Sequence, residues 1–480
     1  MKILYVASEA APYAASGGLG DVMGALPASI KKLGGKDTVV SVILPLYRSI
    51  ADEYRKKMKK IDEFHFYLGW RHAYCGVFEI KAKNVRYLFL DNEYYFYRDQ
   101  LYGDFDDGER FAYFSRAVVE YIRYSGDVPD ILHANDWQSA LSIIYLKTKY
   151  REDSALSRIK TVFTIHNIEY QGKYDVQILS DVFDLDPSYL PYVEYEGAIN
   201  LLKGAVATSD AVSTVSENYA KELHNPYFSF GLSPIIDMFG HKMKGIVNGI
   251  DLSYFNPNKK NDCIIPFTQT RVREGKAANK KALQESLGLP VDENIPLISM
   301  VTRLTAGKGI DLVLHIFEEL MEENIQFVIL GTGEENYERI FSLLAARHGD
   351  RARAILRFDR NLSKQIYASS DLFLMPSKSE PCGLAQMIAC RYGTLPVVHG
   401  VGGLKDTIIP YGEKNANGFV FENFNAHELL FTIKHALAIK NDNADDWTML
   451  VKQAMKTDFS WDASAQKNLD LYAKIIGEKL

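Results

Sequence analysis

The sequence has little cysteine, and its few cysteines stand far apart. Cys75, Cys263, Cys382 and Cys390 form no C-x-x-C pair and no cluster with histidine at zinc-binding spacing. A disulfide framework or a structural zinc site needs several such residues at short, regular spacings. We therefore expect neither, and we predict a site without a bound metal.

Long apolar runs and an excess of positive charge are also missing. No stretch approaches the ~18 apolar residues of a membrane-spanning helix. The first apolar run, residues 2–7, is too short for the core of a signal peptide. The formal net charge of -6 argues against a broad basic face for nucleic acid. We therefore expect a cytoplasmic protein that binds neither membranes nor nucleic acid, although a small phosphate ligand needs only one or two local cations.

A dinucleotide-binding fingerprint is absent as well. Gly331-Thr332-Gly333 has no third glycine, and the 17–20 segment, G-G-L-G, does not have the G-x-G-x-x-G spacing. An NAD-dependent reaction is therefore disfavoured, and no cofactor is expected.

What the chain does have is enough length and apolar content for two cores. Its 480 residues predict two domains of roughly 200 residues each. Runs rich in Val, Ile and Leu without clean alternation indicate strands buried on both faces of parallel sheets, and helical segments between them indicate βαβ units. The expected strands are residues 3–7, 39–44, 87–90, 131–133, 162–165, 212–215 and 245–247, and then 297–301, 327–330, 354–358, 372–375 and 395–398.

The two series of strands resemble each other in one further respect. Gly17–Asp21 (G-G-L-G-D) lies near the start of the first, and Gly402–Asp406 (G-G-L-K-D) follows the last strand of the second. Both predict a glycine turn ahead of a helix. The polar segment 256–262 is the candidate linker. Ligands of open α/β sheets bind beyond the carboxyl ends of the strands, so two doubly wound domains facing each other would hold substrates in a cleft.

Charged residues follow two strands of the second series. Arg303 and Lys308, with Gly307 and Gly309 beside the lysine, come directly after the 297–301 strand. Fixed cations there suit a diphosphate leaving group, whose departure builds negative charge; the alternative is a pair of solvated surface charges. Glu380 follows the 372–375 strand and could reach sugar or ribose hydroxyls, or it could be a carboxylate at a helix start.

Polar side chains also follow two strands of the first series. Asp136 and His166 each stand at an expected strand end. A carboxylate can bind a sugar hydroxyl or stabilise an oxocarbenium-like centre, whereas a single histidine is as readily a buried core residue. Trp137 is interpreted as core rather than as a platform for a sugar.

Two aspartate pairs match the D-x-D pattern of metal-dependent glycosyltransferases. They are Asp104 with Asp106 and Asp184 with Asp186, and both lie in polar, turn-like segments where aspartate is common for turn reasons. A metal role is disfavoured for each. The aromatic segment 94–97 could stack on a glucan or pack within the protein.

Taken together, these segments resemble the bacterial and plant glycogen/starch synthase family over residues 2–475. The matching segments are residues 8–12, 16–21, 133–137, 163–168, 170–172, 248–251, 276–280, 303–308, 380–384 and 392–394, and the closing segment 458–461 resembles the start of the family's last helix. The set in this order is highly specific, although no single piece is.

The resemblance implies a GT-B fold, with two Rossmann-like doubly wound domains across a cleft. The domains would be residues 1–255 on the acceptor side, 256–457 on the donor side, and a helix in 458–480 that returns to the first domain. It also implies the metal-independent, retaining activity of an ADP-glucose:α-1,4-glucan 4-α-glucosyltransferase (EC 2.4.1.21), which elongates glucan at its non-reducing end.

By the same resemblance, particular residues receive roles. The expected catalytic set is Glu380, Asp136, His166, Arg303 and Lys308, with the two cations on the diphosphate. The expected donor- and substrate-binding set is Ser16, Gly17, Gly18, Asp21, Tyr102, Asn248, Phe358, Cys382, Gly383, Leu384, Gly402 and Gly403, with Phe358 standing where the family often has an adenine-stacking tyrosine.

The main departure from the family is Ala15, where its first motif usually has lysine. That residue puts one donor or acceptor contact in doubt and leaves two alternatives: another GT-B glucosyltransferase, or a catalytically impaired glucan-binding homologue. The sequence alone does not decide the preference for ADP over UDP, and homo-oligomer formation stays open.

Overall fold

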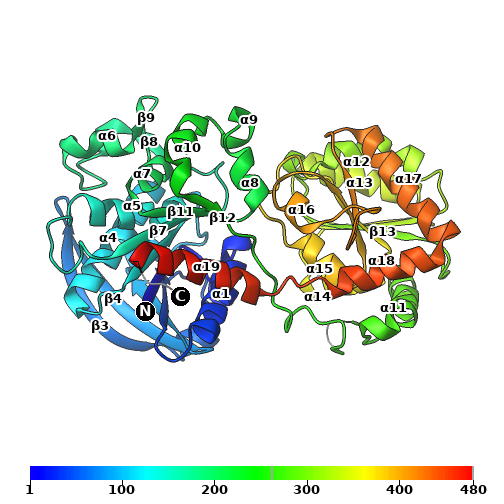
Figure 1. Ribbon diagram of the computed structural model, residues 1–480, viewed down its shortest axis with the longest axis horizontal. Helices are drawn as coiled ribbons and strands as arrows, with labels where there is room; N and C mark the ends of the chain where they lie inside the picture. The colour runs from blue at the N-terminus through cyan, green and yellow to red at the C-terminus, as the bar shows by residue number, and fades with distance from the viewer. Residues whose placement is uncertain (261–262, 478–480) are drawn as a thin grey trace. The chain divides into compact units, whose positions relative to one another are not determined.

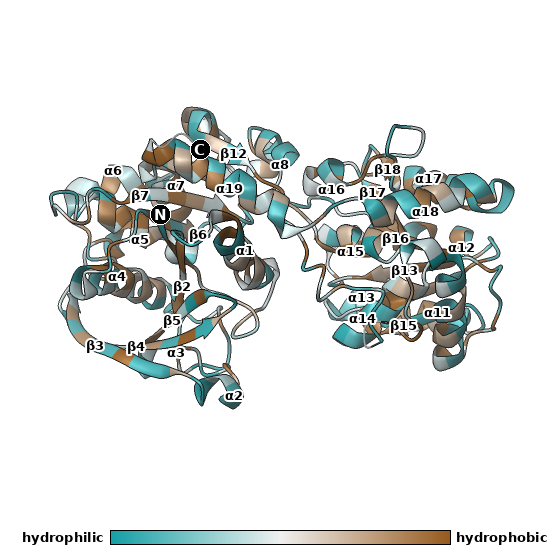
Figure 2. Ribbon diagram, turned by 60° about the horizontal axis from the view of Figure 1, so that its bottom comes forward, coloured by the Kyte–Doolittle hydropathy of each residue, from teal (hydrophilic) through white to brown (hydrophobic). Residues whose placement is uncertain are grey.

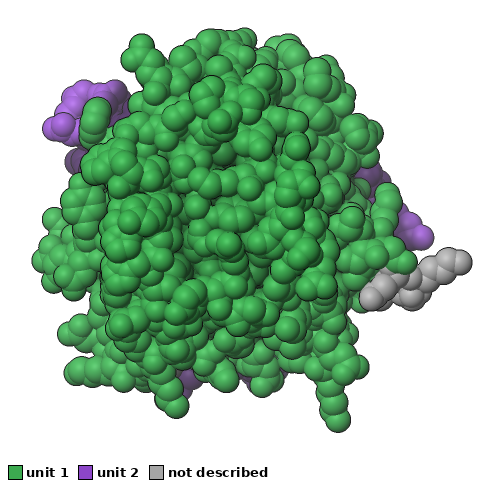
Figure 3. All heavy atoms as spheres, turned by 90° about the vertical axis from the view of Figure 1, so that its left-hand side faces the viewer, with its two compact units in different colours: residues 1–249, 461–480 green, residues 250–460 purple. Residues whose placement is uncertain are grey.

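The computed structural model describes residues 1–260 and 263–477, and the chain divides into two units. Unit 1 is Met1–Gly249 together with the last segment from Trp461, and unit 2 is Ile250–Ser460 (Figures 1 and 3). The sequence places these divisions after residues 255 and 457 instead.

The linker expected at 256–262 is wrong for its described residues, because 256–260 lie inside unit 2. Pro257 is buried, and its carbonyl oxygen accepts the Phe267 N–H at 2.8 Å. Asn261 and Asp262, the last two residues of that segment, lie outside the described residues.

The described part of unit 1 contains a nine-stranded sheet in the order β12-β11-β7-β6-β1-β2-β5-β4-β3. Its bounds are β1 (Lys2–Val6), β2 (Val39–Pro45), β3 (Lys59–Leu68), β4 (Arg71–Ala82), β5 (Val85–Asp91), β6 (Ile131–Asn135), β7 (Lys160–Ile165), β11 (Ala211–Thr214) and β12 (Met243–Gly245). The strands from β12 to β5 are parallel, as the apolar runs predict, and each expected strand is found within two residues of its predicted bounds.

The sequence prediction misses the hairpin β3–β4 at the edge of the sheet. Its strand β4 pairs antiparallel with both β3 and β5. Phe64, Phe66 and Leu68 are buried, whereas His65 and Tyr67 between them are exposed. Figure 2 shows this alternation of apolar and polar residues along β3 and β4. Such alternation is the signal of a strand with one solvated face.

Helices connect the strands of unit 1, and short strands and turns fill the longer loops. The helices are α1 (Gly18–Gly34), α2 (Asp52–Arg55), α3 (Glu93–Phe96), α4 (Asp107–Ser125), α5 (Trp137–Lys147), α6 (Leu190–Val193), α7 (Leu201–Thr208), α8 (Glu217–Glu222), α9 (Pro226–Ser229), α10 (Ser233–Phe239) and α19 (Trp461–Ile476). A small sheet is formed by β8 (Lys173–Asp175), β10 (Ala198–Asn200) and β9 (Glu194–Tyr195).

The last helix, α19, belongs to unit 1 and lies beside α1 (Figure 1). The Tyr472 hydroxyl lies 2.8 Å from the Tyr5 hydroxyl and 2.6 Å from His133 Nδ1. Burial lowers the pKa of His133 to about 3. His133 is therefore a core histidine that docks the end of the chain.

The described part of unit 2 contains a six-stranded, wholly parallel sheet in the order β15-β14-β13-β16-β17-β18. Its bounds are β13 (Leu297–Val301), β14 (Gln326–Leu330), β15 (Ala352–Ile355), β16 (Leu372–Met375), β17 (Leu395–His399) and β18 (Phe419–Phe421), of which β18 is missed by the sequence prediction. The helices are α11 (Val272–Leu287), α12 (Ile310–Leu320), α13 (Glu335–Arg347), α14 (Arg360–Ser369), α15 (Ala385–Arg391), α16 (Gly402–Thr407), α17 (Ala426–Asp442) and α18 (Ala444–Lys456).

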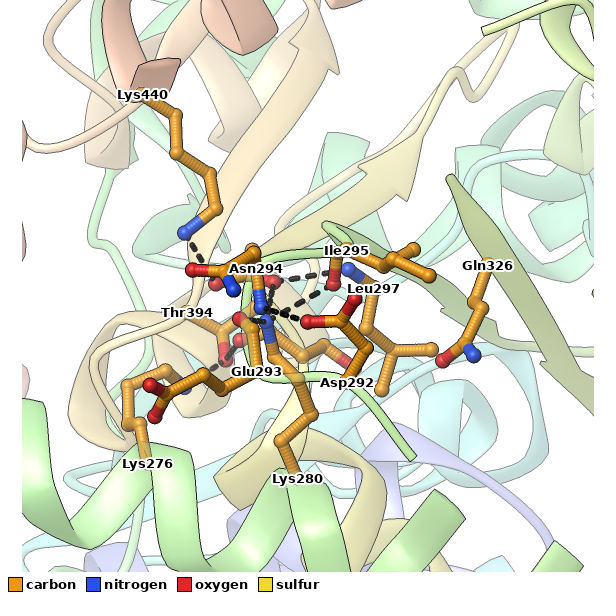
Figure 4. Close-up of polar contacts among 12 residues, drawn as sticks. Lys276, Lys280, Asp292, Glu293, Asn294, Ile295, Leu297, Gln326, Thr394 and Lys440 are labelled. Atoms are coloured by element: carbon orange, nitrogen blue, oxygen red, sulfur yellow. Dashed lines mark hydrogen bonds and ion pairs between the residues drawn. The ribbon is translucent and has the colours of Figure 1, made fainter. Parts of the chain in front are cut away.

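A buried charge cluster closes the amino end of this second sheet. Asp371, directly before β16, lies 2.6 Å from Lys280 Nζ and 3.0 Å from Lys440 Nζ, and it accepts the Leu297 N–H. Figure 4 shows Lys276 and Lys280 rising from one side and Lys440 approaching from the other. Lys276 donates to Thr394 Oγ1 at 2.7 Å. Two lysines of the 276–280 segment therefore hold α11 to the sheet.

Among the described residues, no helix is both long enough and apolar enough to cross a membrane.

Candidate active site

The Glu380 cluster, formed by Arg303, Lys308, Ser377 and Glu380, lies at the carboxyl ends of β13 and β16 in unit 2. Lys308 Nζ lies 2.5 Å from Glu380 Oε2, and the Ser377 hydroxyl donates to the same oxygen at 3.1 Å. Within the described chain, Glu380 Oε1 receives no hydrogen bond. Glu380 is 7% exposed, so the carboxylate is nearly withdrawn from water and its charge is offset by one lysine.

Close backbone approaches hold the loops of this cluster together. The Lys378 N–H donates to the Gly307 carbonyl oxygen at 3.0 Å, and Gly309, at φ 69°, packs so tightly that a Cβ there would lie 1.9 Å from Pro376 O. The Gly403 N–H donates to Glu380 O at 3.0 Å, and a Cβ on Gly403 would meet Cys382 O at 2.2 Å. Gly309 and Gly403 are therefore required by the packing of the three loops that follow β13, β16 and β17.

The remaining predicted residues of unit 2 lie on these loops or beside them. Arg303 is exposed, and within the described chain its guanidinium makes no hydrogen bond or ion pair. Phe358 follows β15, is 78% exposed, and has the Arg360 guanidinium 5.6 Å from its ring centre. Cys382 is buried, and Gly383 (φ 74°) and Leu384 lead into α15. Gly402, at φ 45°, begins α16.

In unit 1, the Glu9 cluster consists of Glu9, Ser16, Gly17 and Tyr102. The Glu9 carboxylate, 4% exposed, accepts the N–H groups of Ser16 at 2.6 Å and Gly17 at 3.2 Å. It also accepts the Ser16 hydroxyl at 2.7 Å and the Tyr102 hydroxyl at 2.8 Å. Burial raises the pKa of Tyr102 well above its ordinary value. The glycine turn ahead of α1 is therefore folded around one buried carboxylate.

Asp136 and His166 lie at the neighbouring ends of β6 and β7. Asp136 has the left-handed φ of 57° and accepts the His166 N–H at 2.8 Å. Burial raises its pKa to about 7, the N–H groups of His166 and Asn167 oppose that shift, and the charge of Glu9 adds to it. His166 Nε2 lies 3.0 Å from Asn135 Oδ1, and burial lowers the pKa of the ring to about 4. The ring is therefore neutral near pH 7, with Nε2 as the donor.

A cavity of about 570 Å³ opens in unit 1, and Trp137, the residue after Asp136, belongs to its lining. It is lined by Trp137, Glu169, Tyr170, Gln171, Gly172, Lys173 and Phe230. Trp137 therefore packs in the core and also lines a cavity. The sequence analysis interprets it as a core residue only. A Cβ on Gly172 would lie 2.7 Å from the Trp137 ring, so only glycine lets the chain cross the indole there.

Three other predicted residues lie on the same unit. Gly18 and the exposed Asp21 belong to the first turn of α1, and Asn248, partly buried, follows β12. Because β7, β6 and β1 are neighbours in the sheet, their carboxyl ends bring the Glu9 cluster and the Asp136–His166 pair to one edge.

Both D-x-D segments are tied into ion pairs and turns. Asp104 and Asp106 pair with Arg110 (3.0 Å) and Arg98 (2.8 Å) respectively, and Asp184 lies 2.6 Å from Lys149. Asp186 accepts the Ser188 N–H at 2.9 Å. In the described ranges, no group of three or more His, Cys, Asp or Glu side chains gathers as a metal site.

Sequence reasoning missed Glu9 and Ser377 as candidate site residues. Glu9 stands in the 8–12 segment that carries the resemblance, but nothing in the sequence pairs it with Tyr102. Ser377 stands three residues before Glu380, a spacing that permits but does not require contact in a loop.

Comparison with known proteins matches both units to glycosyltransferases. Residues 2–238 match the starch synthase catalytic domain, and residues 280–451 match glycosyl transferases group 1. The chain is 45% identical to a glycogen synthase of Geobacillus thermodenitrificans over 99% of this chain and 98% of that protein. It is also 45% identical to a glycogen synthase of Alkaliphilus metalliredigens, over 99% and 100%.

Solved structures agree with the sequence comparison. The catalytic domain of starch synthase IV from Arabidopsis thaliana, bound to ADP and acarbose, has a TM-score of 0.90 and 32% identity over 99% of both chains. A sucrose-phosphate synthase from Thermosynechococcus elongatus, at 18% identity and a TM-score of 0.62 over 99% of both chains, shares the fold. The expected fold class and family are confirmed: the chain is a GT-B glycosyltransferase and belongs to the glycogen/starch synthase family.

Proposed function

We propose that this chain transfers glucose, with retention of configuration, from ADP-glucose to the non-reducing end of an α-1,4-glucan. The observation that carries the proposal is the Glu380 cluster. It contains a lysine–glutamate pair at 2.5 Å, and Arg303, on the same loop after β13 as Lys308, has a guanidinium without a partner in the described chain. The family relationship and the ADP in the starch synthase IV structure support a nucleoside diphosphate as the leaving group.

The cations of this cluster suit the leaving diphosphate. As the bond from the anomeric carbon to the phosphate oxygen breaks, negative charge grows on the diphosphate. Positive groups fixed in advance stabilise that charge without reorganisation. Lys308 is held by Glu380, and the exposed Arg303 remains available for the phosphates. Glu380 Oε1 is then the acceptor for sugar hydroxyls, and the exposed Phe358 ring offers a face for the base.

The groups of unit 1 suit the sugar and the acceptor. Asp136, with its pKa near 7, and the neutral His166 offer hydrogen-bonding groups at one sheet edge. The cavity that Trp137 lines has aromatic and polar side chains, which suit a sugar because apolar ring faces contact aromatic rings and hydroxyls take hydrogen bonds. We assign it to the glucan acceptor.

Transfer of labelled glucose to glycogen tests the proposal. The purified full chain should incorporate glucose from ADP-glucose faster than from UDP-glucose, and EDTA should leave the rate unchanged because protein cations serve the diphosphate. Glu380→Gln, nearly isosteric, should lose about 100-fold or more of the rate.

Three outcomes would contradict it. Transfer to a sugar phosphate but not to glycogen would favour another GT-B glucosyltransferase. Glycogen binding without turnover would favour an impaired homologue. A rate lost with EDTA and restored by Mg²⁺ would favour a metal role for the D-x-D segments.

A further inference from the structure

The Glu380 carboxylate has a second donor, the Ser377 hydroxyl, in addition to Lys308. Lys308 and the Ser377 hydroxyl both reach Oε2, at 2.5 and 3.1 Å, and Oε1 receives nothing from the described chain. Two donors on one oxygen fix the rotation of the carboxylate, whereas a single flexible ammonium would let the two oxygens exchange. The arrangement leaves Oε1 as the one acceptor aimed away from the protein donors.

Ser377 is itself held firmly. It is 1% exposed, and its carbonyl oxygen lies 2.8 Å from His399 Nδ1. The other ring nitrogen, Nε2, lies 3.2 Å from the Glu422 carbonyl oxygen, so the ring is held between two backbone acceptors and its Nδ1 makes the shorter contact. His399 is 5% exposed and stacks on Phe421 with ring centres 5.2 Å apart. The end of β17 therefore fixes the loop that follows β16.

We propose that Ser377, held by His399, is a positioning residue that directs Glu380 Oε1 toward the sugar of the donor. This inference rests on the role proposed above for Glu380. Ser377 acts only through that carboxylate: it sets the rotation of the carboxylate and keeps Oε2 paired with Lys308. No bond to substrate is assigned to Ser377.

The chain offers a matched control. Ser299 is also a fully buried serine, on the neighbouring strand β13, and its hydroxyl has no hydrogen-bond partner among the described residues. Ser377→Ala and Ser299→Ala therefore remove the same buried hydroxyl oxygen, one from the loop after β16 and one from the neighbouring strand β13. Only the first removes a donor to a carboxylate.

The test is a double-mutant cycle on transfer from ADP-glucose to glycogen. Ser377→Ala should lower kcat about tenfold or more, the scale of one hydrogen bond to a charged group, with KM for ADP-glucose changed less than about threefold. Ser299→Ala should match the wild type. In the Glu380→Gln background, Ser377→Ala should have almost no further effect, because its target is already altered.

Two results would overturn the inference: a normal kcat for Ser377→Ala, or the same fold-loss from Ser377→Ala in both backgrounds. Thermal unfolding of each variant separates misfolding from mispositioning, and Ser377→Thr, which keeps the hydroxyl, should recover kcat if the added methyl is accommodated. If Ser377→Thr also unfolds, His399→Gln takes the place of the Ser377 variants in the double-mutant cycle. It should lower kcat by the same factor as expected for Ser377→Ala. Failure of the proposed function looks different, since Glu380→Gln would then retain the wild-type rate.

Discussion

The two ends of strand β16 carry buried carboxylates with opposite surroundings. At the amino end, Asp371 has two lysines and a backbone N–H on its oxygens. At the carboxyl end, Glu380 has one lysine and one hydroxyl on a single oxygen. The pKa of Asp371 lies well below its usual range because Lys280 and Lys440 outweigh its burial. At the amino end every Asp371 oxygen has a partner, whereas at the carboxyl end Glu380 Oε1 and the Arg303 guanidinium have none within the described chain.

This difference separates stability from function within one unit. A fully paired buried cluster contributes to the fold and has nothing left to offer a substrate, so its loss should unfold the unit. In a cluster with open groups, a change at an exposed and unpaired member should lower activity and leave the fold intact. The predictions below test that separation, from the largest expected effect to the smallest.

Asp371→Asn should destabilise unit 2 by about 3–5 kcal/mol, because it leaves the buried Lys280 and the partly buried Lys440 without a counter-charge. Chemical unfolding at pH 7 measures this loss. Wild-type stability should fall as the pH drops through the acidic range, since the folded pKa of Asp371 is depressed and the charged form carries the stability. Glu323→Gln is the control: its pair with Lys434, at 3.1 Å, is exposed and should be worth no more than ~1 kcal/mol.

Lys308→Ala or Arg303→Ala should reduce turnover of ADP-glucose by about 100-fold or more, the usual scale for one preorganised electrostatic donor. The thermal midpoint should change little for Arg303→Ala, because that side chain is exposed, whereas Lys308→Ala leaves the nearly buried Glu380 without its cation and should lower the midpoint as well. Lys434→Ala, which removes an exposed cation from the same unit, should keep the wild-type rate. Normal kcat and KM in both site variants would contradict the proposal that Arg303 and Lys308 bind the leaving diphosphate.

Asp136→Asn should stabilise unit 1 at pH 8 and leave its stability unchanged near pH 4. The folded pKa of Asp136 is raised to about 7, so its contribution to wild-type stability is fully present below pH 4 and is lost as the pH rises through 7. The thermal midpoint should rise by a few degrees, at about 2–4 °C per kcal/mol, while transfer falls.

Asp175→Asn is the control for this pH effect. Asp175 caps a short helical turn through the Gln177 N–H, and asparagine caps as well as aspartate. A midpoint for Asp136→Asn that does not depend on pH would contradict the titration.

Ala15→Lys should lower the KM for ADP-glucose by up to about fivefold with a smaller change in kcat, since an exposed charge pair is worth up to ~1 kcal/mol. Ala15 is exposed, at the turn that Glu9 organises. Ala15→Gln adds similar length without charge and should not lower KM. An unchanged or higher KM for the lysine variant would mean that the loop is built around the small side chain.

Much of the fold could be read from the sequence, because buried parallel strands produce unbroken apolar runs. The sequence predicts the parallel strands of both large sheets, except β18, within a few residues. The hairpin β3–β4 was missed although its alternation is visible, and β18 was missed because three residues carry no period. The linker was misplaced because a polar, proline-containing segment packs inside unit 2.

The candidate site divides in the same way. Arg303, Lys308 and Glu380 follow strands of unit 2, and Asp136 and His166 follow strands of unit 1. Parallel strands deliver such residues to one edge of their own sheet, so the grouping within each unit follows from the sequence. Their roles stay predictions. Glu9 with Tyr102 and Ser377 with Glu380 could not be predicted, because hydrogen bonds between loops depend on how the backbone folds back.

The sequence by itself determined the family, the two parallel sheets and the strand ends where the chemistry is expected, because periodicity and short motifs are local properties. It did not separate Lys276 and Lys280, which are buried among carbonyl oxygens and Asp371, from Lys308, which pairs with Glu380 at the open end. All three are lysines in segments that carry the family resemblance. Only the tertiary structure decided which amino groups are buried within the fold and which lie at the open end of the sheet, because that depends on the surrounding donors, acceptors and water.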